Sequence, residues 1–122
     1  MRFTQDSISA THLVRSYAAG ELRINDQIYR STIIVSASTV EAIPDIQGMS
    51  DLARLEPSRI LALEPELVLL GTGQRQIFAP ESFRAQFLSA GIGFEVMDTG
   101  AACRTFNVLV GEQRRVVALL MV

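Results

Sequence analysis

The sequence contains no lysine, and all eleven basic residues are arginine. The absence of a side-chain amine excludes Schiff-base catalysis by lysine and the lysine grip on phosphate that defines the Walker-A loop. Cysteine and histidine are also scarce, with one of each, Cys103 and His12. A single cysteine cannot form an internal disulfide, which fits a reducing compartment. His12 begins a stretch typical of a strand, and we expect it to be a solvated or hydrogen-bonded residue without a catalytic role.

Long apolar runs and clustered charges are absent as well. No stretch approaches the roughly 20 apolar residues needed to cross a bilayer, and the first residues do not combine basic side chains with an apolar core. The formal net charge is −2, and no run of like charges supplies the positive charge with which proteins bind a phosphate backbone. We therefore expect a cytoplasmic protein that neither spans a membrane nor binds nucleic acid. We also expect no cofactor and no metal ion.

The composition is that of a folded globular protein. Of its 122 residues, 48% are apolar and 20% are charged, which is unlike the composition of a disordered chain. This length corresponds to a single domain over residues 1–122, and folding should bury roughly two thirds of the surface that the unfolded chain exposes. A core of this size requires neither a disulfide nor a metal ion.

Strand patterns dominate the first third of the sequence. Residues 13–17, 21–24 and 28–35 are rich in apolar and β-branched side chains, and the turn-forming residues Gly20 and 25–26 separate them. These segments predict an N-terminal β-hairpin or meander.

Helix and strand patterns alternate in the second half of the chain. The expected elements after the meander are an irregular segment at 38–55, a short helix at 57–63, a strand at 67–70, a helix at 79–90, a strand at 94–97, a helix at 101–112 and a strand at 116–121. In the second of these helices, Phe83, Phe87 and Leu88 should share the buried face. The order predicts an α/β fold with a largely parallel or mixed sheet and helices packed on it.

Two loops follow neighbouring predicted strands, at residues 71–75 and 98–104. The carboxyl ends of parallel neighbours lie along one edge of a sheet, where ligands of open α/β folds bind. Glycines allow close approach of a ligand, and the amides of a helix start and an arginine fork attract anions. The candidate binding residues are Gly71, Thr72, Gly73, Arg75, Asp98, Thr99, Gly100, Cys103, Arg104 and Asn107. The alternative is that the glycines are plain turn residues, since the dinucleotide fingerprint Gly-x-Gly-x-x-Gly is absent.

Cys103 has two interpretations. At a helix start and next to Arg104, its thiolate would be favoured by the helix dipole and the guanidinium, and Asn107 could orient it. However, no base partner is evident in the sequence, and consecutive helix positions diverge by about 100°. The other interpretation is a buried, inert cysteine.

The triplet Asp98-Thr99-Gly100 also occurs in aspartic proteases. In those enzymes it lies early in an all-β chain, whereas here only 22 residues follow it and much of that segment has a helical pattern. A simpler explanation is that Asp98 or Thr99 is the N-cap of the following helix, because an N-cap side chain stabilises the folded protein by about 1 kcal/mol.

The loop Gly71-Thr72-Gly73 after an apolar strand and the long run at residues 94–109 together resemble a known family. It is the small family of uncharacterised α/β proteins that includes mitochondrial respiratory complex I assembly factor 3 and the adipogenesis-associated single-domain protein. Residues 29–36, the helix that begins near Pro80 and residues 114–118 fit the same pattern. The resemblance therefore spans nearly the whole chain.

The resemblance implies a three-layer fold with a central mixed sheet, mostly parallel, whose last strand is antiparallel. It implies no established enzyme activity, and the family members that aid complex I assembly do so by contacting other proteins. Our first hypothesis is accordingly a non-enzymatic binding or assembly module with a protein partner. The alternative is an enzyme or a small-molecule or anion-binding protein that uses the loops at 71–75 and 98–104, with Cys103 as a reactive thiol.

Overall fold

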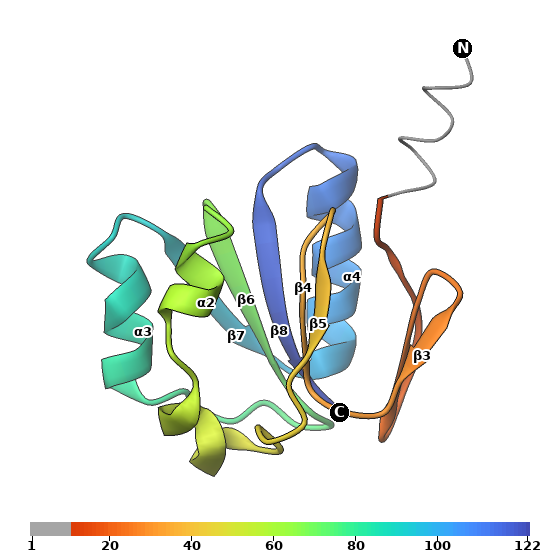
Figure 1. Cartoon of the computed structure of the whole chain (residues 1–122), viewed down its shortest axis with the longest axis horizontal. Helices are drawn as coiled ribbons and strands as arrows, with labels where there is room; N and C mark the ends of the chain where they lie inside the picture. Colours follow the sequence, from red (N-terminus) through yellow and green to blue (C-terminus); the bar gives the residue numbers. More distant parts are fainter. Residues whose placement is uncertain (1–10) are drawn as a thin grey trace.

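The computed structural model describes residues 11–122, which form a three-stranded sheet and a five-stranded sheet with helices (Figure 1). The elements in chain order are β1 (Val14–Ala18), β2 (Glu21–Ile24), β3 (Gln27–Tyr29), β4 (Ile33–Val35), β5 (Val40–Ala42), the 3-10 helix η1 (Met49–Arg54), α2 (Ser58–Leu61), β6 (Leu67–Thr72), α3 (Glu81–Leu88), β7 (Gly93–Met97), α4 (Thr99–Gly111) and β8 (Val116–Met121). The fold is therefore of the mixed α/β kind.

The small sheet is the expected meander. Its strands follow one another in the order β1-β2-β3, and both pairings are antiparallel. Asn25, in the turn between β2 and β3, has a φ of 52°, a left-handed conformation that asparagine tolerates better than most residues. The pairing register shifts between Val14 and Ser16, which marks an irregularity in β1 at the point where the strand meets α4.

The large sheet has the order β5-β4-β8-β6-β7, with two antiparallel pairings followed by two parallel ones. The expectation of a mostly parallel sheet with an antiparallel last strand is wrong in these details. β8 is parallel to β6 and antiparallel only to β4. The physical reason is that α4 carries the chain back along the sheet, so β8 starts at the same edge as β6 and β7.

The single strand expected at residues 28–35 is also wrong, because the chain changes sheets within it. β3 is largely exposed and pairs with β2, whereas all three residues of β4 are buried between β5 and β8. Residues 30–32 connect the two sheets, and there the carbonyl of Thr32 accepts a hydrogen bond from the amide of Ile43. Apolar content is continuous through this segment, so the sequence pattern does not show the break.

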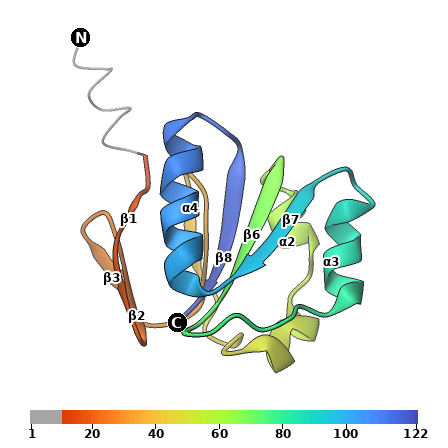
Figure 2. The ribbon, with the colours of Figure 1, turned by 180° about the vertical axis from the view of Figure 1, so that it is seen from behind.

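Two apolar cores lie on the two faces of the large sheet. One lies beneath η1, α2 and α3, and the other beneath α4 and the small sheet (Figures 1 and 2). Phe83 and Phe87 of α3 pack against Phe94 of β7 with ring centroids 5.9 and 5.4 Å from it, respectively. Leu88, which we expected on the same buried face, is 42% exposed. That expectation is wrong because Leu88 follows Phe87 directly, and consecutive helix residues point about 100° apart.

Candidate functional site

The two glycine-containing loops lie next to each other in the structure. β6 and β7 are parallel neighbours, with Gly71 paired with Met97, so residues 71–75 and 98–104 leave the sheet at the same edge. α4 starts directly after β7, and the side chain of Asp98 accepts a hydrogen bond from the amide of Ala101 at 2.9 Å. Asp98 is therefore the N-cap of α4, one of the two assignments that the sequence allows.

Thr99 connects the two loops to each other and to β8. Its amide donates to the carbonyl of Gly73 at 2.8 Å, and its hydroxyl accepts from the amide of Gly73 at 2.7 Å. The same hydroxyl donates to the carbonyl of Met121 at 2.6 Å. Thr99 is fully buried. These three bonds satisfy backbone groups of two strand ends that would otherwise be buried without partners.

Gly71 allows this close contact between α4 and the sheet. A Cβ atom at residue 71 would lie 2.9 Å from the hydroxyl of Thr99, 3.0 Å from its Cα and 3.1 Å from Leu120. A real Cβ does not tolerate such distances to a backbone atom, so only glycine lets α4 approach β6 this closely. The glycine at this position thus serves packing between the helix and the sheet.

Thr99 also occupies the place where a ligand would be expected in this topology. α3 leads from β6 to β7 on one face of the sheet, and α4 leads from β7 past β6 to β8 on the other face. Ligands of open α/β sheets bind where such connections diverge, at the carboxyl ends of the two central strands. Those ends are Gly73 after β6 and Met121 of β8, and the hydroxyl of Thr99 bonds both of them. The junction between these two strand ends is therefore closed by the chain itself.

Thr72 fixes the conformation of the loop that follows β6. Its hydroxyl donates to the carbonyl of Arg75 at 2.6 Å and accepts from the amide of Ile77 at 3.2 Å. The loop consequently has a defined path although it contains no helix or strand. The side chain of Arg75 is exposed and makes no ion pair among residues 11–122.

A small hollow lies beside the start of α4, on the side of the small sheet. Its volume is about 230 Å³. The residues that line it are Val14, Ser16, Tyr17, Gly100, Cys103, Arg104 and Asn107. The structure therefore brings four of the predicted site residues to one place, whereas Gly71, Thr72, Gly73 and Arg75 do not line this hollow.

The electrostatics of this hollow keep its thiol protonated. Cys103 is 5% exposed, and burial raises the pKa of its thiol to about 12, with a further rise from Asp98 and an opposing effect from Arg104. Burial, Cys103 and Asp98 also raise the pKa of Tyr17. A thiol with a pKa far above neutrality holds very little thiolate, which is the form that attacks an electrophile.

Asn107 has a structural partner that the sequence did not suggest. Its side-chain carbonyl accepts from the amide of Val14 at 2.9 Å, and its side-chain amide donates to the carbonyl of Val14 at 2.8 Å. The side chain thus replaces a neighbouring strand at the irregular start of β1 and attaches the small sheet to α4. Asn107 makes these two bonds with backbone groups and none with Cys103.

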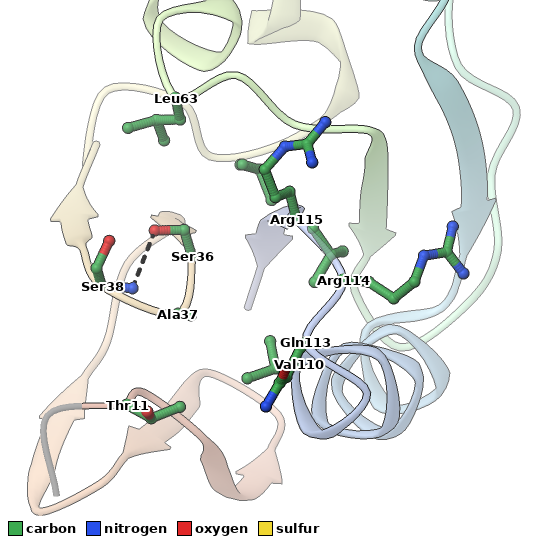
Figure 3. A pocket seen from close by; sticks show the side chains of 11 residues that line it. Thr11, Ser36, Ala37, Ser38, Leu63, Val110, Gln113, Arg114 and Arg115 are labelled. Atoms are coloured by element: carbon green, nitrogen blue, oxygen red, sulfur yellow. Dashed lines mark hydrogen bonds between the residues drawn. The ribbon is translucent and has the colours of Figure 1, made fainter. Parts of the chain in front are cut away.

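A larger hollow, of about 400 Å³, lies at the far end of α4 (Figure 3). None of the predicted site residues lines it. The guanidinium groups of Arg114 and Arg115 point away from Ser36 and Ser38 in Figure 3. Both bond the segment just before β6: Arg114 donates to the carboxylate of Glu66 at 2.9 Å, and Arg115 donates to the carbonyl of Glu64 at 3.1 Å. The polar groups therefore do not converge on one point of this hollow.

An exposed apolar pair, which the sequence pattern did not predict, lies in the loop after β6. Phe78 is 88% exposed and Ile77 is 46% exposed. The pair precedes Pro80 in a segment without a helix or strand pattern, and that position was the available signal, because apolar side chains in such a segment have no core to enter. Phe78 also borders a groove of about 380 Å³ between the start of α3 and β7.

The described residues contain neither a metal-binding cluster nor a membrane-spanning helix. Within residues 11–122, no group of three or more His, Cys, Asp or Glu side chains is placed to hold a metal ion. In the same part of the chain, no helix combines the length and the apolar character that crossing a bilayer requires.

A family model described as "Protein of unknown function (DUF498/DUF598)" matches residues 14–121. The chain belongs to this family. A relative from Danio rerio, "NADH dehydrogenase [ubiquinone] 1 alpha subcomplex assembly factor 3", is 29% identical over 120 residues, which are 96% of this chain and 68% of the relative. The resemblance to the family that includes complex I assembly factor 3 is thereby confirmed.

Two further proteins similar to this DUF498/DUF598 member come from bacteria. The "13 kDa major membrane protein" of Francisella tularensis is 30% identical over 122 residues, with 99% of each chain covered. A solution structure of a protein from Xanthomonas campestris is 35% identical, has a TM-score of 0.79, and covers 92% of this chain and 85% of its own. The solved structure supports the fold described above, and both proteins are comparable in length to this chain.

Proposed function

We propose that this chain is a non-enzymatic binding module that contacts another protein during the assembly of a larger complex. The Danio rerio relative is named as an assembly factor, which supports the assembly part of this proposal. The binding part rests on the chain's own surface.

The observation that carries the proposal is the exposed pair of Ile77 and Phe78. Full burial of a phenylalanine side chain is worth about 1.5–3 kcal/mol, and here 88% of Phe78 faces water. Thr72 holds the loop in place through the carbonyl of Arg75 and the amide of Ile77. An exposed apolar side chain on a loop whose backbone is held in position is suited to contact a partner with little loss of backbone conformational entropy.

The closed loop junction supports a binding module over an enzyme. Thr99 occupies the position between the ends of β6 and β8, and the thiol of Cys103 has a pKa of about 12. His12 hydrogen-bonds the backbone carbonyl of Ser36 and does not line the hollow that contains Cys103. A nucleophile with a neighbouring base is thus not assembled in that hollow.

A photo-crosslinking experiment tests the proposal. Benzoylphenylalanine replaces Phe78 in cells that naturally make the protein, and the matched control carries it at Val108, an exposed apolar position on α4. We expect one discrete adduct with a subunit of a larger complex from position 78 and none from position 108. Native electrophoresis should then show that Phe78→Ser delays the assembly of that complex. Absence of a position-specific adduct, together with turnover of a small substrate, would reverse the proposal.

A second candidate function is the binding of a small anion at the start of α4. The hollow of about 230 Å³ beside Gly100 and Asn107 favours it, because Arg104 borders this hollow and makes no ion pair among residues 11–122. The first-turn amides of a helix and a guanidinium both attract anions. In this function Gly100, Arg104 and Asn107 would contact the ligand, while Asp98 and Thr99 would hold the helix start and Gly71, Thr72, Gly73 and Arg75 would form the neighbouring loop.

Titration with inorganic phosphate tests this second function. Amide chemical shifts of Gly100 and Cys103 should move at millimolar phosphate in the wild type, and they should not move in Arg104→Gln. The matched control, Arg75→Gln, changes an exposed arginine outside the hollow and should leave the phosphate response unchanged. Equal responses of the two variants would indicate non-specific screening and would remove this candidate.

A further inference from the structure

β7 is an edge strand of the large sheet with one side free. It ends the order β5-β4-β8-β6-β7, and no strand within residues 11–122 pairs with its far side (Figures 1 and 2). The amide of Gly93 donates to the carbonyl of Glu66 at the β6 side. Since successive residues of a strand direct their backbone groups to alternate sides, the amides and carbonyls of Phe94 and Val96 point away from β6.

A groove follows this free edge. It has a volume of about 380 Å³ and lies between β7 and the first turn of α3. Its lining residues are Phe78, Ala79, Glu81, Arg84, Phe94, Glu95 and Val96. Phe78 is the most exposed large apolar side chain of the described chain. The groove thus combines free strand backbone with an apolar wall.

The two faces of β7 present different chemistry along this groove. Phe94 contributes to the core beneath α3 and Val96 packs against it, so these side chains lie on the same face as α3. Glu95, between them, points to the opposite face and is exposed. Glu81 pairs with Arg84 at 3.3 Å, whereas Glu95 makes no ion pair among residues 11–122. The uncompensated charge along this edge is therefore negative, and it lies on the face of β7 opposite α3.

We propose that this groove binds an extended segment of a partner protein, which adds to β7 as a sixth strand. The proposal rests on the binding function above and specifies its mode. A segment paired with β7 bonds the outward groups of Phe94 and Val96, and its side chains alternate in step with those of β7. It therefore carries a basic residue opposite Glu95, flanked by apolar residues that contact Val96 and Phe78.

Charge distinguishes this occupant from a second copy of the chain and from a lipid surface. Glu95 is the middle residue of β7 (Gly93–Met97), so antiparallel pairing of two complete β7 strands places one Glu95 opposite the other. Like charges directly opposite each other destabilise a strand pair. The same carboxylate repels the anionic headgroups of a membrane surface. A basic segment of another protein is the occupant that this charge favours.

A peptide titration followed by amide chemical shifts tests the proposal on the full chain. The probe is the capped heptapeptide Thr-Ser-Val-Arg-Val-Ser-Thr, and its matched control has glutamate in place of arginine. We expect saturable shifts at Phe94, Val96 and Phe78 with the arginine peptide, and binding weaker by roughly threefold to tenfold with the glutamate peptide. With Glu95→Arg, the preference between the two peptides should reverse.

Two further variants separate strand addition from a general apolar contact. Val96→Pro removes an amide that points outward and leaves the bonds to β6, so the protein should stay folded while the arginine peptide binds at least tenfold more weakly. Phe78→Ser should weaken binding about tenfold, and Val108→Ser, the control on α4, should not change it. Retention of the wild-type spectrum outside β7 verifies that each variant is folded.

The outcomes distinguish this inference from the proposed function. No shifts at β7, or binding that Val96→Pro and Glu95→Arg do not affect, would overturn strand addition. Crosslinking from position 78 could then still capture a partner, and the proposed function would stand without this mode. Gel filtration that shows a dimer abolished by Val96→Pro would identify a second copy as the occupant. Vesicles of phosphatidylcholine that bind through Phe78 but independently of Glu95 would identify lipid, and either result would refute the proposal.

Discussion

The junction of β6 with α4 and the free edge of β7 are only a few residues apart in the chain, yet they differ in burial and in whether their polar groups have partners. At the junction, Thr99 is fully buried and its polar atoms are bonded to Gly73 and Met121. At the edge, Phe78 is exposed and the backbone groups of β7 face a groove. The closed region is built by the glycine-containing motifs that stand out in the sequence, whereas Phe78, the most exposed large apolar residue of the open region, lies in a segment without a helix or strand pattern. A distinctive motif can therefore mark a demanding packing contact.

The largest expected effect concerns the chemistry of the closed side. Because the pKa of the Cys103 thiol is about 12 against about 8.5 for a free cysteine, its thiolate population at pH 7.5 is lower by roughly a thousandfold or more. Alkylation by iodoacetamide should be slower by roughly a hundredfold or more in the folded protein than in urea, because the greater nucleophilicity of a more basic thiolate offsets only part of its scarcity. The folded-state rate should still rise with pH at pH 10. A plateau near pH 8.5 would show an accessible, ordinary thiol and would contradict the closed junction.

The next largest effect is on stability, from Gly71→Val. The new Cβ would lie 2.9–3.0 Å from Thr99, so α4 must shift away from the sheet. We expect a loss of roughly 2–3 kcal/mol in the free energy of unfolding, measured by urea denaturation. Gly111→Ala is the matched control, because no atom lies within 4 Å of its new Cβ, and it should change stability by less than about 1 kcal/mol. Equal effects of the two substitutions would refute the packing role of Gly71.

A smaller and more local effect is expected from Asn107→Ala. The substitution removes both hydrogen bonds to Val14 and should cost about 1–3 kcal/mol. Because these bonds attach the small sheet to α4, amide exchange should increase in β1 and β2 more than in β6 and β8. Val108→Ala, at the next and exposed position, should cost less than about 0.5 kcal/mol. Uniform exchange changes across both sheets would contradict the role of Asn107 as a local attachment.

The smallest effect on stability is expected at the open edge. Phe78→Ser removes a side chain that is 88% exposed, so the free energy of unfolding should change by no more than about 0.5 kcal/mol. Thermal and urea unfolding measure this directly. A loss above 1 kcal/mol would show that Phe78 packs against the protein itself, and it would remove the contrast with the junction.

The sequence predicts most of the fold after residue 57. Periodicity, proline and glycine place α3, α4, β6, β7 and β8 close to their observed positions, because these elements have continuous patterns and ordinary ends. The change of sheet at residues 30–32 was not predictable, since burial and not composition separates β3 from β4. The orientation of β8 depends on which strands it joins, which is a property of tertiary packing.

The position of the candidate site could be predicted from the sequence, but the contacts between its side chains could not. Parallel β6 and β7 bring the two loops together, as expected from strands that run in the same direction. Sequence could not indicate that the hydroxyl of Thr99 fills the space between Gly73 and Met121, because that depends on how closely α4 approaches the sheet. It also could not show that Asn107 bonds Val14, which is 93 positions away.

The position of β8 has a consequence for how the protein reaches this structure. β8 lies between β4 and β6, and it comes from residues 116–121. Until that segment is available, β4 has an unpaired edge and the apolar side chains of Ile33–Val35 lack their principal neighbour. Pairing of strands this distant in sequence carries a large loop-closure entropy and slows folding. The nascent chain therefore exposes an unpaired apolar strand until β8 is inserted, and this is the stage at which it most needs protection from aggregation.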